Sequence, residues 1–233
     1  MTKLSHRYIC IMAASCLLLI TSVASGEERI WKVASLEWNP YSGSLLEGHG
    51  RSVEKLSELL ARKNIRLEIE FFPWKRAQSL AKTDEYIGYY PAWPSEVNPG
   101  FIASPPIDTS VIAIMKRKDF PLSFTSIDNL FNNYRIGVVS TYVYPGEIDT
   151  AIGRYSHHVV LAKDEDILFR MLIGNRTDVA ITDPKVMNYI AQKQSNLIET
   201  HSILQSEDLV IALRESPETA HRIKIIKQLL SNK

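Results

Sequence analysis

Val179-Ala-Ile-Thr-Asp-Pro184 leads a strand directly into a helix. Val179 to Thr182 is an apolar run of strand length. Asp183 is a favourable N-cap and Pro184 a favourable first helical residue, so a helix is predicted immediately after the strand. Another helix is predicted just before it, from the N-cap Asp164 to the closing Gly174. Such alternation of short strands and helices indicates an α/β fold.

The same alternation extends in both directions from this segment and divides into two similar units. The strands expected in the first unit are 30–35, 65–72 and 86–90, with helices around 53–60 and at 74–82. In the second unit we expect strands 135–139, 158–161 and 179–182, with helices 127–133, 146–153 and 164–174. The sequence therefore predicts two α/β lobes, each with a parallel sheet covered by helices.

Two further strands are predicted between and after these units, at 111–116 and 209–213, followed by a helix at 217–230 whose natural place is on the first lobe. We therefore expect residues 27–109 to form the first part of lobe one and residues 110–203 to form lobe two. Residues 204–233 should then return to lobe one. The hinge would be two-stranded, at about 107–111 and 203–209.

The N-terminus has the order of a secretory signal peptide, covering residues 1–26. A short basic head precedes an apolar run from Tyr8 to Ile20, and small residues follow from Thr21 to Gly26. Cleavage there would give a periplasmic protein that begins near Glu27. An uncleaved membrane anchor and a lipoprotein attached at Cys16 are the alternatives.

Signal cleavage would remove both cysteines, Cys10 and Cys16, so a buried core rather than a disulfide must stabilise the mature chain. It would also remove Lys3 and Arg7 but no acid, which changes the formal charge from +1 to −1. That balance favours neither nucleic acid nor an anionic membrane as a partner. We expect a monomer.

The sequence contains no known catalytic motif, and no pattern in it predicts a metal site or a cofactor. His157-His158 lacks metal-ligand spacing and nearby carboxylates. The acids Asp164, Glu165 and Asp166 are explained by the favourable dipole at a helix N-terminus. We therefore expect a non-catalytic protein without a cofactor.

Four segments connect the chain to a known family: Asn39-Pro40-Tyr41, Pro73-Trp-Lys-Arg-Ala77, Ile102-Ala-Ser-Pro-Pro106 and Val179-Ala-Ile-Thr-Asp183. In this order and spacing they resemble the bacterial extracellular solute-binding proteins of family 3, and most closely a short, poorly characterised branch of it. The family includes the polar amino-acid receptors of ABC importers. The resemblance implies the type II periplasmic-binding fold, with crossovers between the lobes and a ligand at the mouth of both sheets.

Candidate ligand contacts in lobe one follow the ends of strands, where open α/β sheets bind ligands. Trp38 and Tyr41 follow the first strand and offer an aromatic wall, while Tyr90 and Trp93 follow the third. For each of these residues ordinary packing is the alternative. Arg76 is able to hold a carboxylate, but it is as well placed to pair with Glu70 or Asp84.

Candidate contacts in lobe two are Ser140, Thr141 and Asp183. The resemblance implies that Ser140 and Thr141 meet a ligand carboxylate and that Asp183 holds a ligand ammonium. Helix capping is the alternative for all three.

One departure from the family pattern bears on the ligand. Where amino-acid receptors of the family carry an arginine that grips the ligand's α-carboxylate, this chain has Val97, next to Glu96. Valine cannot bind a carboxylate. We therefore expect an amine- or hydroxyl-bearing solute rather than an ordinary free α-amino acid.

The function implied is capture of a small polar solute in the interlobe cleft for an ABC-type importer, with an inner-membrane permease as partner. The alternatives are a sensory or regulatory binding module that contacts a membrane receptor, or an enzyme such as a dehydratase or murein-cleaving relative. An enzyme needs a general acid in the cleft, for which Asp183 is the candidate.

Overall fold

The computed structural model describes residues 29–231. The predicted signal peptide, with both cysteines and its cleavage site, lies outside these residues. Within them, no helix is both long and apolar enough to cross a bilayer.

The chain alternates strands and helices along its described length. The strands are β1 (Arg29–Ser35), β2 (Ile65–Phe71), β3 (Gly88–Ala92), β4 (Phe101–Ala103), β5 (Asp108–Arg117), β6 (Ile136–Val139), β7 (Val159–Ala162), β8 (Val179–Thr182) and β9 (Ile198–Arg214). The α-helices are α1 (Arg51–Ala61), α2 (Trp74–Leu80), α3 (Ile127–Asn133), α4 (Gly146–Arg154), α5 (Glu165–Ile173), α6 (Pro184–Ala191) and α7 (Thr219–Ser231). Four 3-10 turns are η1 (Glu47–His49), η2 (Pro94–Glu96), η3 (Ser156–His158) and η4 (Gln192–Leu197).

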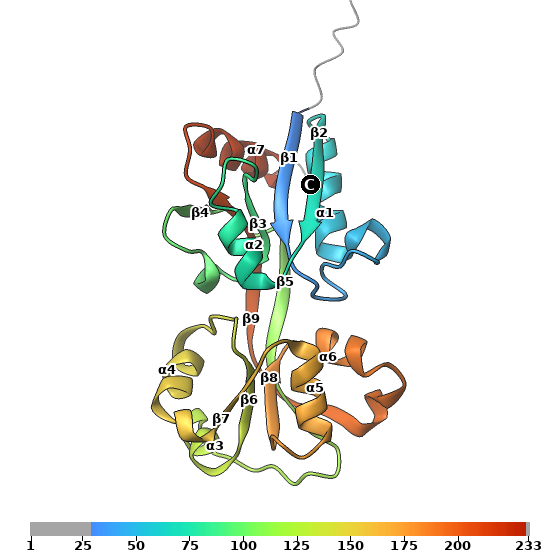
Figure 1. Cartoon of the computed structure of the whole chain (residues 1–233), viewed down its shortest axis with the longest axis vertical. Coiled ribbons are helices and arrows are strands. Elements are labelled where there is room, and N and C mark those ends of the chain that lie inside the picture. The colour runs from blue at the N-terminus through green and yellow to red at the C-terminus, as the bar shows by residue number, and fades with distance from the viewer. Residues whose placement is uncertain (1–28, 232–233) are drawn as a thin grey trace, which may run out of the picture.

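These elements form two α/β lobes, which confirms the predicted fold class (Figure 1). Lobe one contains β1 to β4 with α1, α2 and α7, and its strand β1 pairs in parallel with β2 and β3. Lobe two contains β6 to β8 with α3 to α6, and its strand β6 pairs in parallel with β7 and β8. The strand order of the continuous path is β2-β1-β3-β9-β5-β8-β6-β7.

The strands β5 and β9 run antiparallel through both lobes and connect them (Figure 1). β9 pairs with β3 and β4 in lobe one, and β5 pairs with β8 in lobe two. The sequence predicted 209–213 of β9 and a hinge strand at about 203–209, but not 198–202, which is mostly polar and, apart from Ile198, partly or fully exposed. Pairing with β5, rather than burial, makes that part a strand. The short strand β4 was also missed.

Three apolar clusters hold the structure together. One packs α1 and α7 on the sheet of lobe one through residues such as Leu56, Leu60 and Ile226. A second packs α5 and α6 on the sheet of lobe two, around Leu168 and Met187. The third cluster contains residues of both lobes, so the lobes share a continuous core.

The N-caps predicted from the sequence are observed at two helices. Asp164 caps α5 by accepting a hydrogen bond from the Ile167 N–H at 2.8 Å, as predicted. Asp183 likewise caps α6, with Pro184 in its first turn. Gly174 does end α5, but with φ of −85° it is not in the left-handed conformation that favours glycine.

Candidate functional site

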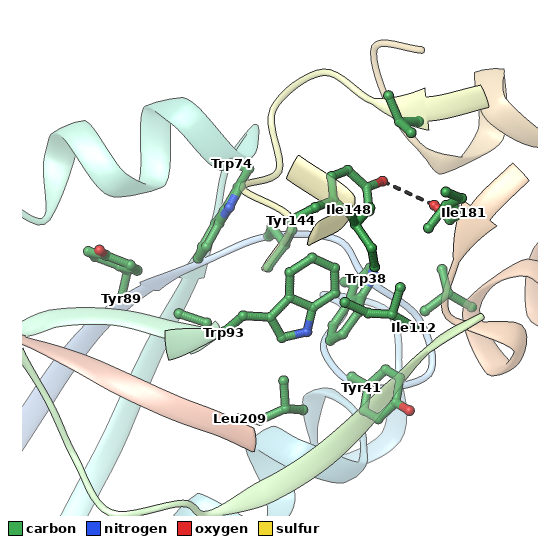
Figure 2. Packing of buried hydrophobic residues seen from close by; sticks show 14 of the residues in the cluster. Trp38, Tyr41, Trp74, Tyr89, Trp93, Ile112, Tyr144, Ile148, Ile181 and Leu209 are labelled. Atoms are coloured by element: carbon green, nitrogen blue, oxygen red, sulfur yellow. Dashed lines mark hydrogen bonds between the residues drawn. The ribbon is translucent and has the colours of Figure 1, made fainter. Parts of the chain in front are cut away.

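The centre of the space between the lobes is filled by aromatic side chains. Trp38 stacks on Tyr41 with 4.5 Å between the ring centroids, and Trp93 meets Trp38 edge-on at 6.1 Å. From lobe two, Tyr142 and Tyr144 contact the ring of Trp93 at 5.4 and 5.8 Å. Figure 2 shows Trp38, Trp93 and Tyr144 gathered in this cluster, with Tyr41 beside them. We call these five side chains the aromatic joint.

A buried hydrogen bond connects the lobes beside the aromatic joint. The Tyr41 hydroxyl donates to Oδ2 of Asp183 at 2.7 Å, and the Val111 N–H of strand β5 donates to the same oxygen at 2.8 Å. The other oxygen, Oδ1, accepts the N–H groups of Lys185 and Val186 as a helix cap. The Asp183 carboxylate thus accepts from four donors. Because Asp183 is also only 1% exposed, no side of its carboxylate is open to a solute in this conformation.

The joint is further fixed by two polar contacts. The Trp93 indole N–H donates to the Ser110 hydroxyl at 2.9 Å, and Ser95 of lobe one donates to the Val143 carbonyl of lobe two at 2.7 Å. The space left between Trp38, Trp93 and Tyr142 is only about 10 Å³, which is room for a single water. The centre of the interlobe space thus holds no solute in this conformation.

A larger groove opens between the lobes next to this centre, with a volume of about 400 Å³. Lobe one contributes Phe71, Phe72, Trp74 and Lys75 to its lining. Lobe two contributes Thr141, Tyr142, Lys163 and Glu165, among others. Because both lobes line it, a molecule bound in this groove contacts both.

The structure brings some of the predicted residues together and separates others. Trp38, Tyr41, Trp93 and Asp183 meet at the joint, as described above. Thr141 lines the groove, whereas Ser140 is exposed and does not. Neither caps a helix, because α4 begins only at Gly146 with Pro145 as its N-cap.

Tyr90 lies away from both the joint and the groove, and Arg76 is not part of the groove lining but lies over Phe72, which is. Tyr90 is fully buried in the core under α1 and α7, where its hydroxyl donates to the Ser52 carbonyl. Arg76 is exposed over the Phe72 ring, 5.8 Å from its centroid. Its suggested partners are taken by other residues, since Glu70 pairs with Lys32 and Asp84 with Arg214.

Two buried carboxyl groups near the joint were not recognised as site residues from the sequence. Glu96 accepts the Trp74 indole N–H at 2.8 Å, and burial raises the pKa of Glu96 to about 7. The Thr182 hydroxyl lies 2.8 Å from both carboxyl oxygens of Glu165. Burial, with a contribution from the nearby Asp183 charge, raises the pKa of Glu165 to about 8. A carboxyl in the first turn of a helix gives no local signal of such burial.

These two groups predict that the protein is less stable at alkaline pH. Both pKa values are raised from 4.5, so the folded state holds more protons than the unfolded state between pH 4.5 and about 8. The stabilisation from the neutral carboxyls is complete below 4.5 and is lost as the pH rises through 7 and 8. Each group lowers the free energy of unfolding by up to about 1.4 kcal/mol per pH unit in its window.

Urea unfolding between pH 5 and about 8.5 measures this slope. Glu96→Gln and Glu165→Gln remove the titrating groups and are expected to flatten it. The paired carboxyls Asp108 and Asp178 have lowered pKa values, so they finish titrating below this window. A wild-type stability that stays constant or rises across the window would contradict the assignment.

The comparisons with known proteins rest on structure. No protein-family model matches the sequence, and the search of curated proteins finds no match. Among solved structures, a histidine kinase sensor domain with similarity to periplasmic binding proteins superposes with a TM-score of 0.73 at 16% identity, covering 88% of this chain and 90% of that one.

Two amino-acid-binding structures superpose similarly well. The arginine-bound form of ArgBP from T. maritima gives a TM-score of 0.69 at 18% identity, covering 87% of this chain and 95% of that one. The GluR0 ligand-binding core with L-glutamate gives 0.70 at 18% identity, covering 89% and 95%. At these identities the similarity establishes a two-lobe fold like that of the periplasmic binding proteins, and the fold alone.

Proposed function

We propose that this chain is an exported, monomeric solute-binding protein that captures a small solute in the groove between its lobes. The observation that carries the proposal is the groove itself, which has a volume of about 400 Å³ and is lined from both lobes. Its volume lies within the range typical of small-molecule sites. Similarity to binding proteins and to a sensor domain with the same fold supports a binding role.

The mechanism follows from the two-sided lining. A solute that touches Phe72 and Lys75 of lobe one together with Thr141 and Lys163 of lobe two makes its full set of contacts only when the lobes are closed. Such a solute stabilises the closed form relative to any more open one, because it binds the two forms with different affinity. The aromatic joint limits how far the lobes separate and keeps the solute out of the centre.

In this proposal Trp38, Tyr41, Trp93 and Asp183 shape the closed form, and the groove residues contact the solute. Asp183 is already saturated by donors from the protein, so it is not the partner of a ligand ammonium. The closed protein would then be presented to an inner-membrane permease of an ABC-type importer. A membrane receptor for a sensory module would recognise a closed form in the same way, and a transport assay separates the two.

Blocking the groove tests the proposal. Thr141 is partly exposed and makes no side-chain hydrogen bond within residues 29–231, so Thr141→Trp is expected to fill the groove without unfolding the protein. Native mass spectrometry of protein purified from the periplasm should show a bound solute in the wild type and none in this variant. Thr150→Trp, on the exposed face of α4, is the matched control and should keep the solute. If the solute is retained in Thr141→Trp, the groove is not its site.

A further inference from the structure

The groove presents two cations from opposite lobes, Lys75 beside Trp74 and Lys163 just before α5. Both are exposed side chains. In the part of the chain that the structure describes, neither forms a salt bridge or a side-chain hydrogen bond. Three lysines elsewhere in this part of the chain, Lys32, Lys55 and Lys116, have carboxylate partners, whereas others such as Lys82 do not.

Three acids also line the groove, and none of them forms an ion pair with Lys75 or Lys163. Glu37 accepts the Ser44 N–H with both of its oxygens, at 3.1 and 3.2 Å. Asp164 is occupied as the N-cap of α5. Glu165 is buried beside the Thr182 hydroxyl and is mainly uncharged at neutral pH, since burial raises its pKa to about 8. The groove therefore combines two free cations with acids that are neutral or held by backbone donors.

Apart from Thr141, the rest of the lining is mainly apolar. Phe71, Phe72, Pro73 and Trp74 form a wall on lobe one, which faces Val139 and Tyr142 of lobe two. Such a wall takes up a flat hydrocarbon body and removes water from around it, which strengthens polar contacts at its edge.

We propose that the groove binds a small organic acid with an apolar or aromatic body, whose carboxylate is held between Lys75 of lobe one and Lys163 of lobe two. This ligand class rests on the proposed function, because it assumes that the groove is the solute site. An amine of the same shape adds a third cation and is rejected.

Three probes with one body and different heads test the ligand class: hydrocinnamate, hydrocinnamyl alcohol and phenylpropylamine. Calorimetry at low salt and neutral pH should show hydrocinnamate binding at least about tenfold more tightly than the alcohol, with the amine weakest. Lys75→Gln and Lys163→Gln should each weaken the acid by about threefold to tenfold and leave the alcohol unchanged. Lys82→Gln changes an exposed lysine just after α2, outside the groove lining, and should have no effect.

The outcomes separate the ligand class from the proposed function. In one outcome all three probes bind equally, Thr141→Trp abolishes their binding, and the lysine variants leave it unchanged. The groove is then the site, but its ligand is not an acid. If hydrocinnamate binds equally well to Thr141→Trp, both proposals fail, because the probe sits elsewhere. If none of the probes binds, the assignment of an apolar organic acid is wrong. Selective loss of hydrocinnamate in both lysine variants supports it.

Discussion

Asp183→Ala is expected to lower the free energy of unfolding by about 3–5 kcal/mol. The substitution removes an N-cap, which is worth about 1 kcal/mol. It also leaves the part-buried Val111 N–H and the buried Tyr41 hydroxyl without an acceptor, at about 1–2 kcal/mol each. Chemical denaturation with a common slope gives the difference.

Asp164→Ala provides the matched control for this experiment. Asp164 also caps a helix of lobe two, but it is exposed and its Oδ1 accepts only the Ile167 N–H. Its loss is expected to cost about 1 kcal/mol, which is the cap alone. The difference between the two alanine variants then measures the contacts of Asp183 with Tyr41 and β5. Equal losses in the two variants would mean that the link between the lobes contributes nothing.

Tyr41→Phe isolates the hydrogen bond from the cap. It removes only the hydroxyl that donates to Asp183 and keeps the ring stacked on Trp38. We expect a loss of about 1 kcal/mol. In X-ray scattering, a larger radius of gyration for this variant would indicate that the hydrogen bond also holds the lobes closed.

The sequence predicted the elements well where the signal is local. Asp183 followed by Pro184 fixes the start of α6, and Asp164 fixes the start of α5. The contact between Tyr41 and Asp183 joins residues 142 positions apart, so no local pattern contains it. From the sequence, Asp183 was predicted to be either a helix cap or a ligand contact. The structure adds a third role, the hydrogen bond to Tyr41 between the lobes, which only tertiary packing reveals.

Tyr90 illustrates how a small shift in a strand changes a functional prediction. The sequence predicted a strand from 86 to 90, which placed Tyr90 at its end, near a ligand. The observed strand β3 runs from Gly88 to Ala92, so Tyr90 lies in its middle. Neighbouring side chains of a strand point to opposite faces. Tyr89 accordingly packs against Trp74, while Tyr90 enters the core under α1.

The groove residues were the hardest to predict, because they matter only as a set. Thr141 was identified from its place after a strand, but Lys75, Lys163 and Glu165 were not. Each has an ordinary explanation in its own segment, such as an exposed helix position or a helix N-terminus. Their meeting depends on how the two lobes pack, which no local pattern contains.

Trp93→Ala is expected to have an effect as large as Asp183→Ala, with a loss of about 3–5 kcal/mol in the free energy of unfolding. Trp93 is 3% exposed, contacts Trp38 and Tyr142 from the two lobes, and donates to Ser110. Alanine leaves a cavity at the centre of the joint and an unpaired hydroxyl. Leu45→Ala, at a side chain that is 98% exposed, is the control and should change stability by less than about 0.5 kcal/mol. Because Trp93 joins the cores of the two lobes, the variant should also unfold less cooperatively, and calorimetry should show separate thermal transitions for lobe one and lobe two. A single transition with a loss below about 1 kcal/mol would mean that the lobes fold together for a reason other than the aromatic joint.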